Sequence, residues 1–469
     1  MSLAGAATTA TLQRARWAPW LAAAAGCAFA CWLLAPGWMS WDSAYQWKQA
    51  RTGAFDATHP PLITLLWAWI EPFWSGPMPM LVLQQVLLWG ALGGIAASLP
   101  THWSLRAGLV LVLGLWPPLL LLSGHIWKDI PMLGAFALAV WMLRLELAQP
   151  GWRWRLLAVL MLLLACLCRH NAITGAAPLL LWIVWRSLPT LPRFAALQPA
   201  PGPLLRAALA LPPALVLALA VHALAQLPNH APGVKNPQAL WSVVALWDLA
   251  AVSLDEGVLL APAAFQMPEA QVEALRPHFN HWSNTTLYES GQLVHTLWKR
   301  FPDADVAALR RAWLRLPFEH PGPYFAHRLR VAALLFGFDN AALPDHQVLM
   351  AGQFAMEGNP PVAVPSRPAR DALLAWATRN VDGPFFMGWL YLLLALGAGL
   401  VALPGFLRDA PSAALAGAVA ASALCYALPL AVVSGSAEFR YLAWPLLAAL
   451  LAPLLLRWGA RHEVTPSAD

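Results

Sequence analysis

The segment WDSAYQW (residues 41–47), followed by GAFDATHPP (residues 53–61), comes directly after the first hydrophobic stretch of the chain. It places Asp42, Asp56, His59 and a rigid Pro-Pro pair just outside that stretch. Polar groups beside a lipid-embedded helix are costly unless they bind or react with something. This segment is therefore the first place to look for a functional site, and the apolar sequence on both sides of it predicts the fold.

Composition predicts an all-α polytopic membrane protein. Hydrophobic residues make up 59% of the chain, charged residues 11%, and the mean hydropathy is +0.56, so the solvent of this chain is largely lipid. Windows of about 18–22 apolar residues predict about ten transmembrane helices. They are expected near residues 17–36, 78–99, 107–123, 130–148, 156–168, 172–185, 205–226, 385–405, 411–433 and 441–457.

Basic residues predict the orientation of these helices. Lys and Arg in short loops stay in the cytoplasm, and an inner amino terminus places eleven of them inside and five outside. The five outer residues are Lys48, Arg51, Lys128, Arg169 and Arg440. The chain is thus expected in a bacterial inner (plasma) membrane, with its polar loops on the periplasmic or extracellular face. The pI near 9.3 reflects inner-leaflet anchoring and requires no nucleic-acid partner.

The hydropathy pattern divides the chain into three parts. Residues 1–226 form a transmembrane module of about seven helices with a long first outer loop at 37–77. Residues 227–384 mix charges, aromatic residues and prolines, which predicts a mainly helical extracytoplasmic domain with a helix at 305–316. The apolar piece 331–338 is too short to cross a membrane and is expected to be interfacial or buried. Residues 385–469 supply the last helices and a cytoplasmic tail.

The outer loops carry a set of residues with complementary chemistry. They are Asp42, Tyr45, Asp56 and His59 in the first loop, His125, Lys128 and Asp129 in the second, Arg169 and Asn171 in the third, and Glu438, Arg440 and Tyr441 before the last helix. Transfer of a sugar needs a carboxylate as general base on the acceptor hydroxyl. It also needs cations that hold the departing phosphate. This set contains both.

Asp42-Ser-Ala-Tyr45, a following glycine and His59-Pro-Pro61 resemble the first outer loop of the GT-C superfamily of membrane glycosyltransferases. Within it, residues 17–226 are similar to the bacterial aminoarabinose transferases, the protein mannosyltransferases and related polyprenyl-phosphate-sugar-dependent enzymes. The resemblance implies that Asp42 and Asp129 are the two acidic site residues and that transfer inverts the anomeric carbon. The paired carboxylates common in that loop are Asp42-Ser43 here. A divalent metal ion therefore remains an open alternative rather than an expectation.

The expected function is transfer of a sugar from a polyprenyl-phosphate donor to a glycan, lipid or protein acceptor on the outer face. Asp42 is expected to be the catalytic base, with Asp129 positioning the acceptor or sharing that role. Lys128, Arg169 and Arg440 would balance the phosphate of the leaving lipid. A nucleotide-sugar donor is not expected, because the sequence has no Gly-rich phosphate loop.

Each of these residues also has a purely structural interpretation. Asp42 is a suitable N-cap for a helix through residues 45–49, and His59 with its two prolines can simply begin the next helix. Lys128-Asp129 can be an interfacial ion pair that fixes the fourth helix. Arg169 and Arg440 can extend to lipid head groups from the ends of helices.

A transporter or flippase of lipid-linked saccharides is the alternative for the whole chain. Transporters carry ionisable groups and broken helices near the middle of the bilayer. The Trp116-Pro-Pro118 break in the third span and His222 in the seventh favour that interpretation. The remaining charges gather at helix ends on one side, which favours a transferase. A non-catalytic assembly protein is a third alternative, and it predicts that Asp42 is dispensable.

Overall fold

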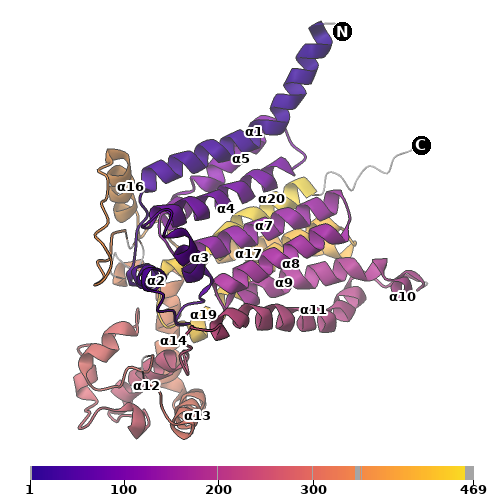
Figure 1. Ribbon diagram of the computed structural model, residues 1–469. Coiled ribbons are helices and arrows are strands. Elements are labelled where there is room, and N and C mark those ends of the chain that lie inside the picture. Colours follow the sequence, from indigo (N-terminus) through magenta and orange to yellow (C-terminus); the bar gives the residue numbers. More distant parts are fainter. Residues whose placement is uncertain (1–2, 198, 298, 344–348, 350, 460–469) are drawn as a thin grey trace.

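In the computed structural model, which describes residues 3–197, 199–297, 299–343, 349 and 351–459, the chain is a bundle of helices with a smaller helical domain at one end (Figure 1). Within those residues the structure contains helices and isolated β-bridges but no strand. The bundle helices are α1 (Leu3–Leu34), α4 (Met78–Ala97), α5 (Trp103–Gly114), α6 (Pro117–Ser123), α7 (Asp129–Ala148), α8 (Trp152–Cys168), α9 (Ala172–Ser187), α11 (Pro203–Gln226), α17 (Gly388–Leu407), α18 (Pro411–Ala427) and α20 (Ala443–Gly459). The predicted helical fold is confirmed.

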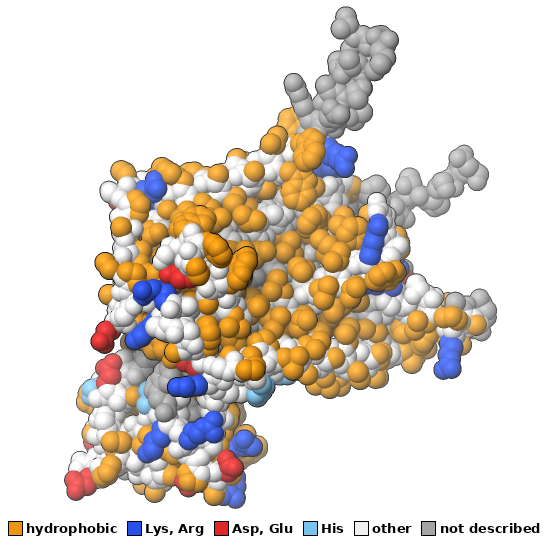
Figure 2. Space-filling view, in the orientation of Figure 1, with side chains coloured by type: hydrophobic (Ala, Val, Ile, Leu, Met, Phe, Trp, Pro, Cys, Tyr) orange, Lys and Arg blue, Asp and Glu red, His pale blue; other side chains and the backbone are white. Residues whose placement is uncertain are grey.

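Eight helical segments in the described ranges are long and apolar enough to cross a membrane, and nine if α5 and α6 form one broken span. Hydrophobic side chains cover the flank of the bundle, while charged side chains lie toward its two ends (Figure 2). These features indicate an integral membrane protein. The predicted count of ten is not confirmed, because α8 has only 17 residues and falls just below the length of a typical span. The predicted cytoplasmic tail from residue 460 onward lies outside the described residues.

The third span is broken where the sequence suggested. Pro117 and Pro118 cannot continue the hydrogen-bond ladder of a helix, and the chain bends by 63° between α5 and α6. Gln84 of α4 donates to the carbonyl oxygens of Ser123 and His125, both at 2.7 Å. These bonds satisfy buried carbonyls at the end of α6, which lies beside the candidate site.

The predicted first outer loop contains two helices, α2 (Trp41–Thr52) and α3 (Leu62–Ile70). Ser40 is the N-cap of α2, and its N–H donates to the Ser43 hydroxyl at 2.9 Å. The N-cap interpretation of Asp42 is therefore wrong, because Asp42 lies in the first turn and its carboxylate is available for other partners. The Pro-Pro pair does precede a helix, since Pro61 is the N-cap of α3.

The domain at one end of the bundle is built on α12 (Ser242–Glu256), α13 (Asp303–Glu319) and α14 (Pro321–Leu335), whose buried side chains form a core of their own. The helix α16 (Pro368–Arg379) instead packs against the bundle, beside α1. The helix expected at 305–316 corresponds to α13. The segment 331–338 ends α14, and Val331 and Leu335 are buried there, so it is a buried helix end. Figure 1 shows α2, α3 and this domain at the same end of the bundle, opposite α10 (Pro192–Ala195).

Candidate functional site

The centre of the candidate site is the Asp42 carboxylate in the first turn of α2. Its Oδ2 accepts from Arg440 Nη2 at 2.8 Å, and its Oδ1 lies 3.7 Å from His59 Nε2. Lys128 Nζ is hydrogen-bonded to His59 Nδ1. Because an ammonium can only donate, Nδ1 is the acceptor and Nε2 carries the hydrogen of the neutral ring. The ring thus points its N–H toward Asp42.

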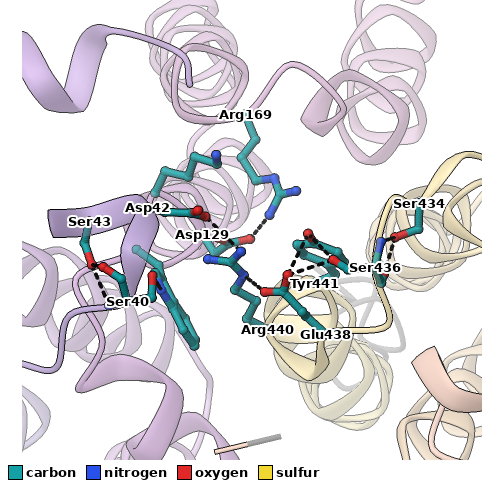
Figure 3. Close-up of polar contacts among 12 residues, drawn as sticks. Ser40, Asp42, Ser43, Asp129, Arg169, Ser434, Ser436, Glu438, Arg440 and Tyr441 are labelled. Atoms are coloured by element: carbon teal, nitrogen blue, oxygen red, sulfur yellow. Dashed lines mark hydrogen bonds and ion pairs between the residues drawn. The ribbon is translucent and has the colours of Figure 1, made fainter. Parts of the chain in front are cut away.

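Arg440 lies between two carboxylates (Figure 3). It belongs to the short helix η7 (Phe439–Leu442), and its Nε forms an ion pair with Glu438 Oε2. Glu438 Oε1 accepts from the Ser436 hydroxyl at 2.7 Å and from the Tyr441 hydroxyl at 3.3 Å. Arg440 also covers the ring of Trp127 at 4.8 Å. These contacts engage Nε and Nη2 of Arg440.

Asp129 pairs with Arg169. Asp129 begins α7 and is fully buried, and its Oδ1 accepts from Arg169 Nη1, as Figure 3 also shows. Arg169 lies in the turn between α8 and α9, donates to Asn171 Oδ1 at 3.2 Å, and covers the Tyr441 ring at 4.6 Å. The Lys128-Asp129 ion-pair interpretation is therefore wrong, because helix geometry directs the two adjacent side chains to different partners.

The lipid-head-group interpretation of the two arginines is also wrong. The side chains of Arg169 and Arg440 are only 13% and 8% exposed, and both form ion pairs inside the protein. A cation that extends to a lipid head group keeps its charged end in water. These guanidinium groups instead belong to a buried charge network in which three cations, Lys128 among them, face three carboxylates.

Burial and neighbouring charges shift several pKa values in this network. Burial raises the pKa of Asp42, but the cation of Arg440 and the His59 and Lys128 side chains outweigh that effect and hold it well below its usual range. Burial and Lys128 together lower the pKa of His59 to about 3, so the ring is neutral. Burial also lowers the pKa of Lys128 to about 8, although the Asp42 carboxylate acts in the opposite direction.

The domain at the end of the bundle positions the segment that carries Arg440. Ala437 N–H donates to the Trp282 carbonyl at 2.8 Å, and Asn284 Nδ2 donates to the Gly435 carbonyl at 2.8 Å. Arg328 Nη1 donates to the Ser434 carbonyl at 2.7 Å. Arg328 is itself held by the buried carboxylate of Asp248 at 2.6 Å. The loop before α20 is therefore fixed by the domain as well as by the bundle.

A cavity of about 790 Å³ opens onto this network. Asp42, Glu438 and Arg440 form one wall, and the other walls include Ser283 of the domain and Gln353 of the segment before α16. Asp42 is 23% exposed, so its carboxylate is accessible from the cavity. The cavity is large enough for a sugar and part of an acceptor. Its polar side chains come from segments that lie far apart in the sequence.

Not every predicted site residue lies at this cavity. Tyr45 and Asp56 are hydrogen-bonded to each other and line a second cavity of about 680 Å³. His125 stacks on Trp127 at 3.9 Å between ring centroids and bonds the Leu121 carbonyl at 3.1 Å, which places it behind the site. The expectation of one convergent site is therefore only partly correct, because α2 presents its residues to two cavities.

Sequence reasoning missed three residues that shape the site. Trp127 donates from Nε1 to the Ser40 hydroxyl at 2.9 Å and lies under Arg440. Ser436 holds Glu438, and Gln353 lines the cavity. Only Trp127 had a sequence signal, namely its position beside Lys128-Asp129. Ser and Gln in long segments between apolar helices carry no comparable signal.

The described residues contain no group of three or more His, Cys, Asp or Glu side chains arranged to hold a metal ion. No family model, curated protein or solved structure matches the chain.

Proposed function

We propose that this protein is a membrane glycosyltransferase of the GT-C type. It would move a sugar from a polyprenyl-phosphate donor to a glycan, lipid or protein acceptor on the periplasmic or extracellular face of a bacterial inner membrane. The observation that carries the proposal is the position of the Asp42 carboxylate, which lines a large cavity, pairs with Arg440 and lies beside His59, itself hydrogen-bonded to Lys128. A base and the cations needed for a leaving phosphate are thus adjacent.

The proposed step transfers one proton and exchanges one bond. The acceptor hydroxyl gives its proton to Asp42 while its oxygen bonds to the anomeric carbon of the donor. The bond from that carbon to the phosphate oxygen breaks, and the electron pair leaves with the phosphate. The cations of Arg440 and Lys128 would stabilise that charge as it develops. His59 fixes the direction of Lys128 and orients its own N–H toward Asp42.

The low pKa of Asp42 implies that the donor activates the base. Without substrate, Asp42 is surrounded by positive charge and is a weak base. A phosphate that binds Arg440 and Lys128 neutralises part of this charge, so the pKa of Asp42 rises toward its ordinary value. The carboxylate becomes a stronger base only when the donor is in place. This order of events protects the site from unproductive proton transfer.

The direct test is transfer of a radiolabelled sugar from polyprenyl-phosphate donors by the purified full-length protein in lipid nanodiscs. The proposal predicts donor-dependent labelling of an acceptor fraction from the same envelope. If every donor is bound but none is consumed with any acceptor fraction, the transferase proposal fails.

Transport of lipid-linked saccharides is the second candidate function, and the 63° break between α5 and α6 favours it. Broken spans build substrate sites in transporters. Reconstitution in vesicles separates the two functions. A transporter would move a labelled lipid-linked sugar between leaflets without changing its chemistry, whereas the proposed transferase would release the sugar from its lipid.

Transfer is expected to decline above about pH 8. Lys128 is charged below its pKa of about 8 and loses its proton above it, so donor binding weakens as the pH rises. We expect kcat/KM for the donor to fall by about tenfold per pH unit above this value. In Lys128→Arg the cation stays charged, and the decline should disappear. Lys48→Arg, a change in the first loop away from the site, is the matched control. An unchanged decline in Lys128→Arg would contradict the assignment.

A further inference from the structure

The second cavity, of about 680 Å³, lies where the first loop, the end of α11 and the domain meet. Its lining includes Tyr45, Asp56, Thr58, Lys235, Lys299 and Arg300. Tyr45 stacks on Trp41, which lines the Asp42 cavity, at 5.0 Å between ring centroids. The linings of the two cavities therefore contact each other through this stacked pair at the start of α2. The role proposed for Asp42 does not use this second cavity.

The lining of the second cavity is cationic. Within the described part of the chain, Lys235, Lys299 and Arg300 form no ion pair with a carboxylate. The carboxylate in the lining is Asp56, whose Oδ1 accepts from Thr58 N–H at 2.9 Å and whose Oδ2 accepts from the Tyr45 hydroxyl. Three cations thus face a concave space whose negative charge is already engaged, which favours an anionic ligand.

The backbone that carries these cations is fixed. Ala57 N–H donates to the Lys235 carbonyl at 2.8 Å, and Lys235 N–H donates to the Phe55 carbonyl at 3.0 Å, which ties the domain to the first loop. Gln238 bonds both the N–H and the carbonyl of Phe301, at 2.9 and 2.8 Å. A cavity with its cations on fixed segments loses less conformational freedom when it binds a ligand.

The second cavity is close to the candidate base. Tyr45 follows Asp42 by three residues on α2, a spacing that places two side chains about 5–6 Å apart at Cβ. Thr58 lines the cavity, and the next residue, His59, lies 3.7 Å from Asp42. The lining of the second cavity and the surroundings of Asp42 are therefore joined through α2 and through the adjacent residues Thr58 and His59.

We propose that the second cavity binds a phosphate group of the acceptor and holds its hydroxyl toward Asp42. Three clustered cations match a multiply charged anion better than a single carboxylate. In the proposed function, the donor phosphate binds elsewhere, to Arg440 and Lys128. The assignment to the acceptor rests on the proposed function, whereas phosphate binding does not.

Phosphate binding can be measured without any transfer activity. The probe is pyrophosphate, titrated by calorimetry at low salt into the full-length protein in phosphatidylcholine nanodiscs. The test variant is Lys235→Gln/Lys299→Gln/Arg300→Gln. The control, Arg310→Gln/Arg311→Gln/Arg379→Gln, removes the same charge from exposed positions outside the cavity. We expect one pyrophosphate site to weaken by more than about tenfold in the test variant only. Equal binding by the two variants, or no binding by wild type, would overturn the proposal.

Nanodiscs that contain phosphatidylglycerol distinguish the source of the phosphate. Competition with pyrophosphate in both wild type and the control variant assigns the cavity to a phospholipid head group of the acceptor. Absence of competition assigns it to a phosphate that is not part of a phospholipid. Both outcomes support the same chemistry.

The transfer assay tests the assignment to the acceptor. The triple variant should raise KM for a phosphate-bearing acceptor while kcat, KM for the donor and KM for a phosphate-free acceptor stay unchanged. Unchanged KM together with lost pyrophosphate binding would refute the acceptor assignment. Absence of transfer in wild type would refute the proposed function and leave the binding result intact.

Discussion

Replacing Asp42 by Asn is expected to lower kcat for sugar transfer by about 10²–10⁴-fold, because the amide cannot accept the proton of the acceptor hydroxyl. Donor binding should persist or become tighter. In wild type the carboxylate accepts from Arg440 Nη2 and lies beside His59, which is hydrogen-bonded to Lys128. Without its negative charge, the cations of Arg440 and Lys128 are less neutralised and attract the donor phosphate more strongly. Loss of folding would instead weaken transfer and donor binding together. The measurement is steady-state transfer combined with equilibrium binding of the labelled donor.

The matched control for this change is Asp371→Asn. Asp371 belongs to α16, its side chain is 62% exposed, and its ion partner Arg370 lies 3.7 Å away. This variant loses the same charge from the same end of the protein and should transfer at the wild-type rate. If Asp42→Asn transfers as fast as Asp371→Asn, Asp42 is not the base, although the protein can still be a glycosyltransferase.

Replacing Asp129 by Asn is expected to destabilise the protein by about 3–5 kcal/mol, the cost of leaving one partner of a buried ion pair uncompensated. Asp129 is fully buried and pairs with Arg169, whose other close contacts are the Asn171 amide and the Tyr441 ring, while the nearby Arg440 cation repels it. The double variant Asp129→Asn/Arg169→Gln removes both charges and should recover most of that loss. The measurement is the unfolding midpoint in detergent for the two single variants and the double variant.

An exposed ion pair provides the control for the Asp129 cycle. Arg206 and Asp409 are paired, but Asp409 is 47% exposed, so its replacement by Asn should cost less than about 1 kcal/mol. Transfer by the stable double variant then separates two roles for Asp129. Recovered transfer makes the Asp129–Arg169 pair structural, whereas stability without transfer retains Asp129 in the chemistry. A stable Asp129→Asn single variant would contradict the ion-pair argument.

The sequence by itself determined the class of the protein. Long apolar windows predict helices because a chain in lipid must satisfy its backbone hydrogen bonds within each segment. The windows at 78–99, 130–148 and 205–226 therefore correspond closely to α4, α7 and α11. The same logic placed the polar residues at helix ends, since charges inside a bilayer are costly.

The sequence also predicts some of the helix ends and breaks. Two consecutive prolines predict the bend between α5 and α6, because proline lacks an N–H and clashes with the preceding turn. The alternative interpretation of Asp42 as the N-cap of α2 is wrong by two residues, since Ser40 and Asp42 have similar capping propensity. Local propensity cannot choose between two such neighbours.

Only the tertiary structure decided which charges meet. Asp42 and Arg440 are separated by almost the whole chain, and their 2.8 Å contact depends on how α2, the domain and η7 pack together. For the same reason, Asp129 forms its ion pair with Arg169 and not with the adjacent Lys128. Pairing energies vary steeply with distance and burial, and neither is encoded by local sequence. The sequence thus named the charged groups, whereas packing determined their partners and divided them between two cavities.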